Sequence, residues 1–179
     1  MSPSSRAYWG IVIILLHTQG VSVIMQLPAF FSSLIPALLG PILLLTAGIT
    51  RKPRSWLYTA ALWSGMVAGV CSLPYVLVHR DPIWIPSPVI MFGLSAQGFL
   101  SLCLFQEASN YEASAPVRRI AIAYFSTVVV LFLLEFWKCF SHGALSSGWA
   151  IIHQLCYLAR MITGFFLVGS ILNLQSRRV

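Results

Sequence analysis

The last hydrophobic stretch of the sequence, residues 149–174, carries two ionisable side chains, His153 and Arg160, inside an otherwise apolar run. An arginine near a bilayer centre costs about 2.5–3.5 kcal/mol on insertion scales, so it normally faces a bundle interior, a wet cavity or a partner. His153, Cys156 and Tyr157 follow i, i+3, i+4 spacing and therefore share one helix face. Arg160, at i+7, falls on the same face. This stripe is the strongest functional signal in the sequence.

Arg160 is the residue whose chemistry is hardest to explain by packing alone. It lies twelve residues into its helix, which places it about 18 Å from the helix end and near the middle of a membrane core of about 30 Å. Its guanidinium cannot lose its charge. Three kinds of partner are open: Glu135, the backbone carbonyls around residues 36–41, or a bound anion or lipid headgroup. We predict a role in a substrate or proton path, with a purely structural clamp as the alternative.

Glu135 and His153 could pair across a helical hairpin. Glu135 lies five residues before Phe140, and His153 lies five residues after Gly148. In an antiparallel hairpin both side chains therefore fall at the same depth, where they could serve as a proton relay. The interpretation that we favour is a local pair of Glu135 with Lys138 at i+3, while His153 hydrogen-bonds a backbone carbonyl.

Cofactor and metal chemistry are less well supported. His17 lies in the first apolar stretch and joins Tyr157 among the candidate path residues. His17 and His153 together could ligate haem b, but their predicted depths differ, so we predict no cofactor. The four cysteines stand singly and indicate no metal site, although a disulfide between Cys71 and Cys139 is an open alternative. No H-E-x-x-H, G-x-S-x-G or P-loop motif is present, and an enzyme is therefore less expected than a non-enzyme.

The composition defines the kind of protein that must position these residues. Of 179 residues, 58% are hydrophobic and only 8% are charged, whereas an ordinary soluble domain is about 25% charged. The mean hydropathy is +0.85. The formal charge of +7 resides in short basic clusters at the ends of apolar segments, where it indicates topology and contact with anionic lipid and not nucleic-acid binding. The sequence therefore predicts a polytopic integral membrane protein.

Six windows have the length and apolarity of a membrane helix. They cover residues 7–27, 30–50, 56–78, 85–105, 117–140 and 149–174. The predicted fold is an all-α bundle of six transmembrane helices forming a single membrane domain over residues 1–179. The polar interval 106–116 is expected to be a solvated loop.

Two windows carry further local signals. Pro36 and Pro41 predict a kink or break near the middle of the second helix, because proline removes a donor and clashes with the preceding turn. In the third helix, Ala61, Gly65 and Gly69 recur at four-residue intervals. Such a face lets a neighbouring helix approach closely, and dimerisation is one further interpretation of it.

The basic residues predict the orientation. With six helices, eight Lys and Arg residues fall on one side and two on the other, and Arg160 lies within the membrane. Both termini are therefore expected to be cytoplasmic. A polar pocket is expected to open outward between the first, second, fifth and sixth helices.

The predicted function is a small transport or channel component, or an accessory subunit of a membrane complex, with a polar intramembrane site on the last helix. One alternative is a non-catalytic interaction or scaffold protein. Another is a membrane enzyme that uses haem b or a quinone, or that modifies lipid. The expected partners are the lipid bilayer and either further copies of the chain or another membrane protein. The expected location is the plasma membrane, which is the inner membrane if the source is bacterial.

Overall fold

The computed structural model describes residues 3–16, 35–48, 56–79, 87–109, 115–141 and 147–176. Each of these six segments forms an α-helix, so the described part of the chain is all-helical, as predicted. The helices are α1 (Pro3–Leu16), α3 (Ile35–Gly48), α4 (Trp56–His79), α5 (Ser87–Ser109), α6 (Ala115–Phe140) and α7 (Ser147–Ser176).

Four of the described helices are long and apolar enough to cross a membrane, judged by length and composition. Their apolar windows are Trp56–Pro74, Ser87–Ala108, Ala115–Phe140 and Ile151–Ser170. α1 and α3 have 14 residues each, which corresponds to about 21 Å against a hydrocarbon core of about 30 Å. The predicted first and second spans extend into residues outside the described part.

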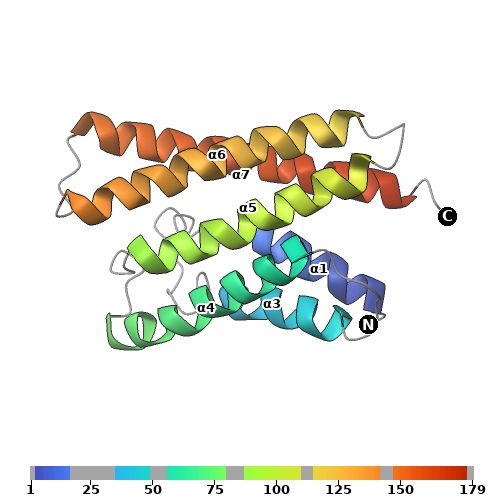
Figure 1. Cartoon of the computed structure of the whole chain (residues 1–179), viewed down its shortest axis with the longest axis horizontal. Helices are drawn as coiled ribbons and strands as arrows, with labels where there is room; N and C mark the ends of the chain where they lie inside the picture. Colours follow the sequence, from blue (N-terminus) through green and yellow to red (C-terminus); the bar gives the residue numbers. More distant parts are fainter. Residues whose placement is uncertain are drawn as a thin grey trace.

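The helices form a bundle in which α1 contacts α3, α5 and α7. α4, α5, α6 and α7 run alternately in opposite directions, and each packs against the next along the chain (Figure 1). α3 packs between α1 and α4, while α1 also contacts α5 and α7. The start of α1 and the end of α7 lie at the same end of the bundle (Figure 1).

The core contains buried side chains from all six described helices, with α5 and α6 contributing the most. Its fully buried side chains include Leu15, Leu100, Tyr124 and Leu167. The outer surface is covered by large apolar side chains, and only 22% of the apolar window of α7 is buried inside the bundle. Exposed large apolar side chains in such number are typical of a surface in contact with lipid or with another protein. The structure is therefore a membrane-type helical bundle.

Of the predicted kink or break in the second helix, the break does not occur at Pro41, because α3 continues through this residue to Gly48. A single proline removes one intrahelical donor, and a helix packed on both sides can accept that loss. Pro41 is buried between its neighbours. Pro36 is the second residue of α3, where a backbone N–H would have no intrahelical acceptor in any case.

The predicted small-residue face of α4 lies inside the bundle. Ala61, Gly65 and Gly69 are all buried. A Cβ atom at position 65 would come within 2.8 Å of Cγ of Pro41 and within 3.7 Å of Cβ of Ala96. Gly65 therefore allows α3 and α5 to approach α4 closely, and this face packs within one chain.

The polar interval 106–116 differs from the expected loop. α5 continues to Ser109, so Gln106 and Glu107 are helical and exposed. α6 begins at Ala115, two residues before the predicted start. Helix ends continue into polar residues where these can remain hydrated. For this reason, hydropathy alone placed the end of α5 too early and the start of α6 too late.

Candidate functional site

The hairpin of α6 and α7 brings Glu135 and His153 together. The His153 Nε2 atom lies 2.7 Å from Oε1 of Glu135, which is hydrogen-bonding distance. The Glu135 side chain is 1% exposed and that of His153 is 18% exposed. The two side chains therefore lie at the same level of the α6–α7 hairpin.

Lys138 contacts the same carboxylate from the other side. Its Nζ atom is 3.8 Å from Oε2 of Glu135, one turn earlier on α6, and its side chain is 34% exposed. The two arrangements considered for Glu135, a pair with His153 and a local pair with Lys138, thus occur together. The carboxylate is held between an imidazole inside the bundle and an ammonium group near its surface.

Arg160 lies deeper, in the middle of α7, and is 2% exposed. One terminal nitrogen, Nη1, donates a hydrogen bond to the side-chain oxygen Oε1 of Gln97 on α5. The guanidinium carbon is 5.1 Å from the centre of the Tyr157 ring, which is cation–π distance. It also interacts with the hydroxyl of Tyr124, which is fully buried on α6. All three groups are neutral.

Two backbone carbonyls of α1 support these neutral groups. Nε2 of Gln97 donates to the carbonyl oxygen of Ile14 at 3.0 Å. The Tyr124 hydroxyl donates to the carbonyl oxygen of Leu15 at 2.7 Å. Both carbonyls belong to α1 (Pro3–Leu16). α1 therefore anchors the groups that contact Arg160.

These contacts join into one continuous series, which we call the polar line. The His153 and Tyr157 rings are 4.8 Å apart in an edge-to-face arrangement, so Tyr157 connects the His153 pair with Arg160. From the partly exposed end to the buried end, the polar line consists of Lys138, Glu135, His153, Tyr157, Arg160 and Gln97. Most of its members are ionisable or can pass a proton.

The partner predicted for Arg160 differs from the one observed. Neither Glu135 nor the carbonyls near Pro41 make the described hydrogen bond, which goes to Gln97. The polar groups accordingly come from α1, α5, α6 and α7, and not from the second predicted helix. α3 instead packs against α1, since a Cβ at Gly40 would lie 2.8 Å from Cγ1 of Ile14.

Gln97 and Tyr124 are the residues that sequence reasoning missed. Gln97 is a lone amide in the middle of the apolar window Ser87–Ala108, and it is 3% exposed. A polar side chain in that position has to find a partner inside the bundle, so the signal was present. Tyr124 gave a weaker signal, because tyrosine is common in apolar helices.

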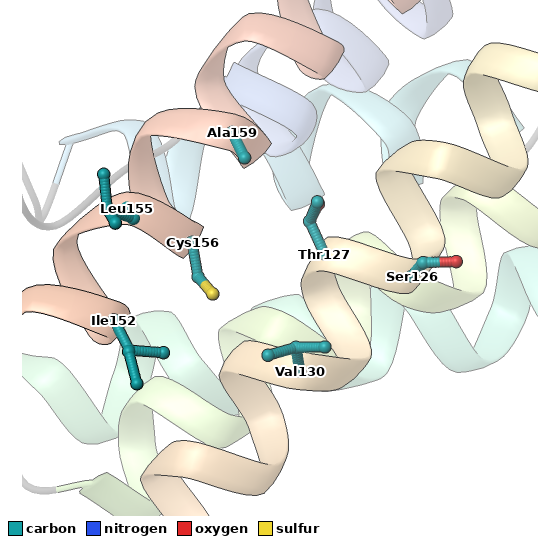
Figure 2. A pocket seen from close by; sticks show the side chains of 7 residues that line it. All are labelled: Ser126, Thr127, Val130, Ile152, Leu155, Cys156 and Ala159. Carbon is teal, nitrogen blue, oxygen red and sulfur yellow. The ribbon is translucent and has the colours of Figure 1, made fainter. Parts of the chain in front are cut away.

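A groove also lies between α6 and α7, and its character is different. Its volume is ≈ 370 Å³, and it is lined by Ser126, Thr127, Val130, Ile152, Leu155, Cys156 and Ala159 (Figure 2). The two hydroxyls bond carbonyls of their own helix, those of Ile122 at 3.0 Å and Tyr124 at 2.7 Å. The groove is therefore apolar, whereas the predicted outward pocket was polar.

The remaining predictions concern cysteines and cofactors. Cys71 and Cys139 are both free and exposed, so the structure contains no disulfide between them. His17 lies outside the described residues. The Nε2 atom of His153 is engaged with Glu135, and ligation of haem through that nitrogen would break this contact. Within the described segments, no group of three or more His, Cys, Asp or Glu side chains could hold a metal ion.

Comparisons with protein-family models, with curated proteins and with solved structures found no match for this chain.

Proposed function

We propose that this chain is an integral membrane protein of six spans that acts as a small transport or channel component, alone or as an accessory subunit of a larger membrane assembly. Four helices support the membrane location by their length and composition. The apolar stretches 7–27 and 30–50 would supply two further spans. The eight-to-two distribution of Lys and Arg favours cytoplasmic termini, in a plasma or bacterial inner membrane.

The observation that carries this proposal is the continuity of the polar line. It begins at Lys138, whose side chain is 34% exposed, and reaches Arg160, which is 2% exposed, through side chains in successive contact. Ionisable groups inside a membrane are costly and usually mark ion or proton pathways. Apolar side chains of similar size would pack the bundle without that cost.

Each member of the polar line has a distinct proposed role. Lys138 and Glu135 form the entrance near one end of the bundle. His153 accepts or releases a proton beside Glu135, and the Tyr157 ring connects it with the deeper site. Arg160 supplies a permanent positive charge at that site. His17, on the first apolar stretch, remains a proposed further residue of the same path.

Flux measurements in vesicles test this function. The purified full chain is reconstituted into liposomes, and the decay of an imposed pH gradient and of an imposed salt gradient is compared with that in protein-free vesicles. We expect at least one gradient to decay faster with the protein. Arg160→Gln should slow that decay by about tenfold, which corresponds to about 1.4 kcal/mol in activation free energy.

Arg119→Gln is the matched control, because Arg119 is exposed on α6 and undergoes the same chemical change. It should leave the flux unchanged. Equal decay rates in wild-type and protein-free vesicles would contradict the proposed function. So would an unchanged rate for Arg160→Gln in a variant that elutes from size exclusion as the wild type does.

A second function, an interaction protein without transport, is favoured by the exposure of α7. Only 22% of its apolar window is buried, compared with 50% for α5. Exposed apolar side chains such as Leu155 at 59% and Phe166 at 64% could contact a partner helix. Purification in mild detergent tests this alternative: a partner present in stoichiometric amount, together with an absence of flux, would favour it over the path.

A further inference from the structure

The groove between α6 and α7 lies within the apolar windows of these two helices. All its lining residues fall in Ala115–Phe140 or Ile151–Ser170, stretches long and apolar enough to cross a membrane. The side chains of Val130 and Cys156 extend from the two helices into the space between them (Figure 2). Leu155 and Ile152, on its α7 side, are 59% and 44% exposed. The groove therefore opens on a surface that membrane lipid would cover.

The lining of the groove suits an apolar ligand. The hydroxyls of Ser126 and Thr127 donate to carbonyls of their own helix, so neither proton is free for a ligand. The thiol of Cys156 is a weak donor, and a free cysteine packs as a small hydrophobic residue. A polar ligand would lose its hydration in the groove without gaining a strong donor, whereas an apolar ligand has nothing to lose.

The size of the groove favours a single hydrocarbon chain over a helix. An α-helix with its side chains is about 10–12 Å wide, so each turn fills on the order of 500 Å³. The whole groove has a volume of ≈ 370 Å³, which is less than one such turn. A partner helix could therefore insert only individual side chains, whereas a flexible chain of methylene groups can lie along the groove.

The depth of the groove matches that of one acyl chain. Ile152 lies next to His153, which contacts Glu135, so it is about one helical turn below the level of Lys138. Ser126, twelve residues before Lys138 on α6, lies about 18 Å below that level. The acyl chains of one leaflet fill about half of a core of about 30 Å. A lipid with its headgroup beside Lys138 would therefore have its chain at the depth of the groove.

The end of the hairpin has the features of a headgroup level. Trp137 and Trp149 are 60% and 46% exposed there, and indole rings favour the headgroup region. The Lys138 side chain is 34% exposed while its partner Glu135 is 1% exposed, so the ammonium group is the charge that faces outward. Thr127 lies eleven positions before Lys138, about three turns, and so on the same face of α6. The ammonium group is thus located above the groove, where it is complementary to a lipid phosphate.

We infer that the groove between α6 and α7 binds one acyl chain of an anionic phospholipid, whose phosphate contacts Lys138. The inference uses the membrane character of the helices and does not depend on transport, so it holds whether or not the polar line conducts. The bound chain would cover the outer seam of the α6–α7 hairpin, on the side away from the buried core. Burial of its methylene groups against the lining residues supplies the binding free energy, and the ammonium group supplies the preference for an anionic headgroup.

Native mass spectrometry tests this inference. The full chain is purified in detergent, stripped of lipid and titrated with long-chain phosphatidylglycerol, and the bound molecules are counted. We expect one lipid molecule to bind more tightly than any further ones. Cys156→Phe places a ring in the groove and should weaken this binding by about tenfold. Cys71→Phe is the matched control, because Cys71 is exposed on α4 and undergoes the same change, and it should bind as the wild type does.

Two comparisons separate the headgroup from the acyl chain. Lys138→Gln should remove the preference for phosphatidylglycerol over the zwitterionic phosphatidylcholine, whereas Arg119→Gln, exposed at the other end of α6, should retain it. A short-chain phosphatidylglycerol carries the same headgroup without a chain that reaches the groove. Its binding should therefore be the same in the wild type and in Cys156→Phe.

Cross-linking of the wild type locates the chain and does not require any variant to fold. A phosphatidylglycerol with a photoreactive diazirine near the end of one acyl chain should label the groove residues of α6 and α7 in preference to exposed residues of α4. Labelling spread over all exposed apolar side chains would overturn the inference, as would equal weakening by Cys156→Phe and Cys71→Phe. A wild-type dimer that Cys156→Phe dissociates would assign the groove to a second copy of the chain and would also overturn it.

Discussion

The two ends of the polar line stabilise buried charge in different ways. At the entrance, Glu135 is paired with the charged Lys138 and the titratable His153, and the cluster reaches the surface through a lysine that is 34% exposed. At the buried end, Arg160 is 2% exposed and contacts neutral side chains, of which Gln97 and Tyr124 are held in turn by carbonyls of α1. The entrance stabilises its charge with groups of opposite charge, and the buried end stabilises its charge with oriented neutral dipoles.

This difference indicates where each cluster can tolerate change. An exposed lysine can reach water when its partner is lost, and a histidine can become neutral. A buried guanidinium has neither option, because it keeps its proton and lies far from both ends of α7. We therefore expect mutations around Arg160 to have larger effects on stability than mutations around Glu135.

The largest effect is expected for Gln97→Leu. This change removes the amide oxygen that accepts from Arg160 and leaves the cation with less compensation inside the bundle. Leaving a buried charged group without a hydrogen-bond partner typically costs more than the ~1–3 kcal/mol of a neutral group. Unfolding of the detergent-purified protein, followed by circular dichroism during titration with a denaturing detergent, would measure the change in free energy.

A double variant provides the internal comparison. In Gln97→Leu combined with Arg160→Met, the charge and its acceptor are both absent, so most of the lost stability should return. The coupling free energy between the two sites would then be well above the ~0.6 kcal/mol average of interhelical hydrogen bonds in membranes. Additive losses in the double variant would show that Gln97 acts only by filling space.

A smaller effect is expected for Glu135→Ala. Its neighbours, His153 and Lys138, can respectively stay neutral and turn toward the surface, so the cost should be about 1–3 kcal/mol, close to that of an ordinary buried polar group. The same denaturation experiment measures it. A loss larger than that of Gln97→Leu would reverse the comparison between the two clusters.

The sequence was most informative where helices adjacent in the chain meet. The hairpin between α6 and α7 has a short connection, so counting residues from its turn placed Glu135 and His153 at one depth, and the structure brings them within 2.7 Å. The 3.6-residue period likewise placed Tyr157 beside Arg160. Local spacing and the fixed rise of a helix are sufficient for such contacts.

Contacts between helices distant in the chain were not predictable in this way. Gln97 and Arg160 are separated by 63 positions, and residue spacing says nothing about which of six apolar helices are neighbours in space. Glycines pack between α1 and α3 and between α3 and α4, and this close packing decides which helices are neighbours. As a result α1, and not α3, lies near the residues that contact Arg160. The bias of basic residues predicts sides of a membrane and carries no information on neighbours.

The smallest effect is expected for Lys138→Met, which removes the most exposed member of the entrance cluster. A pair at 3.8 Å with one side chain 34% exposed should contribute below about 1 kcal/mol, because water and salt screen it. The thermal midpoint of unfolding should therefore change little. Glu135→Ala combined with Lys138→Met should then be no less stable than Glu135→Ala alone. A marked further loss of stability would mean that the ammonium group stabilises the buried cluster itself. The entrance cluster and the neutral surroundings of Arg160 would then no longer differ in the way described above.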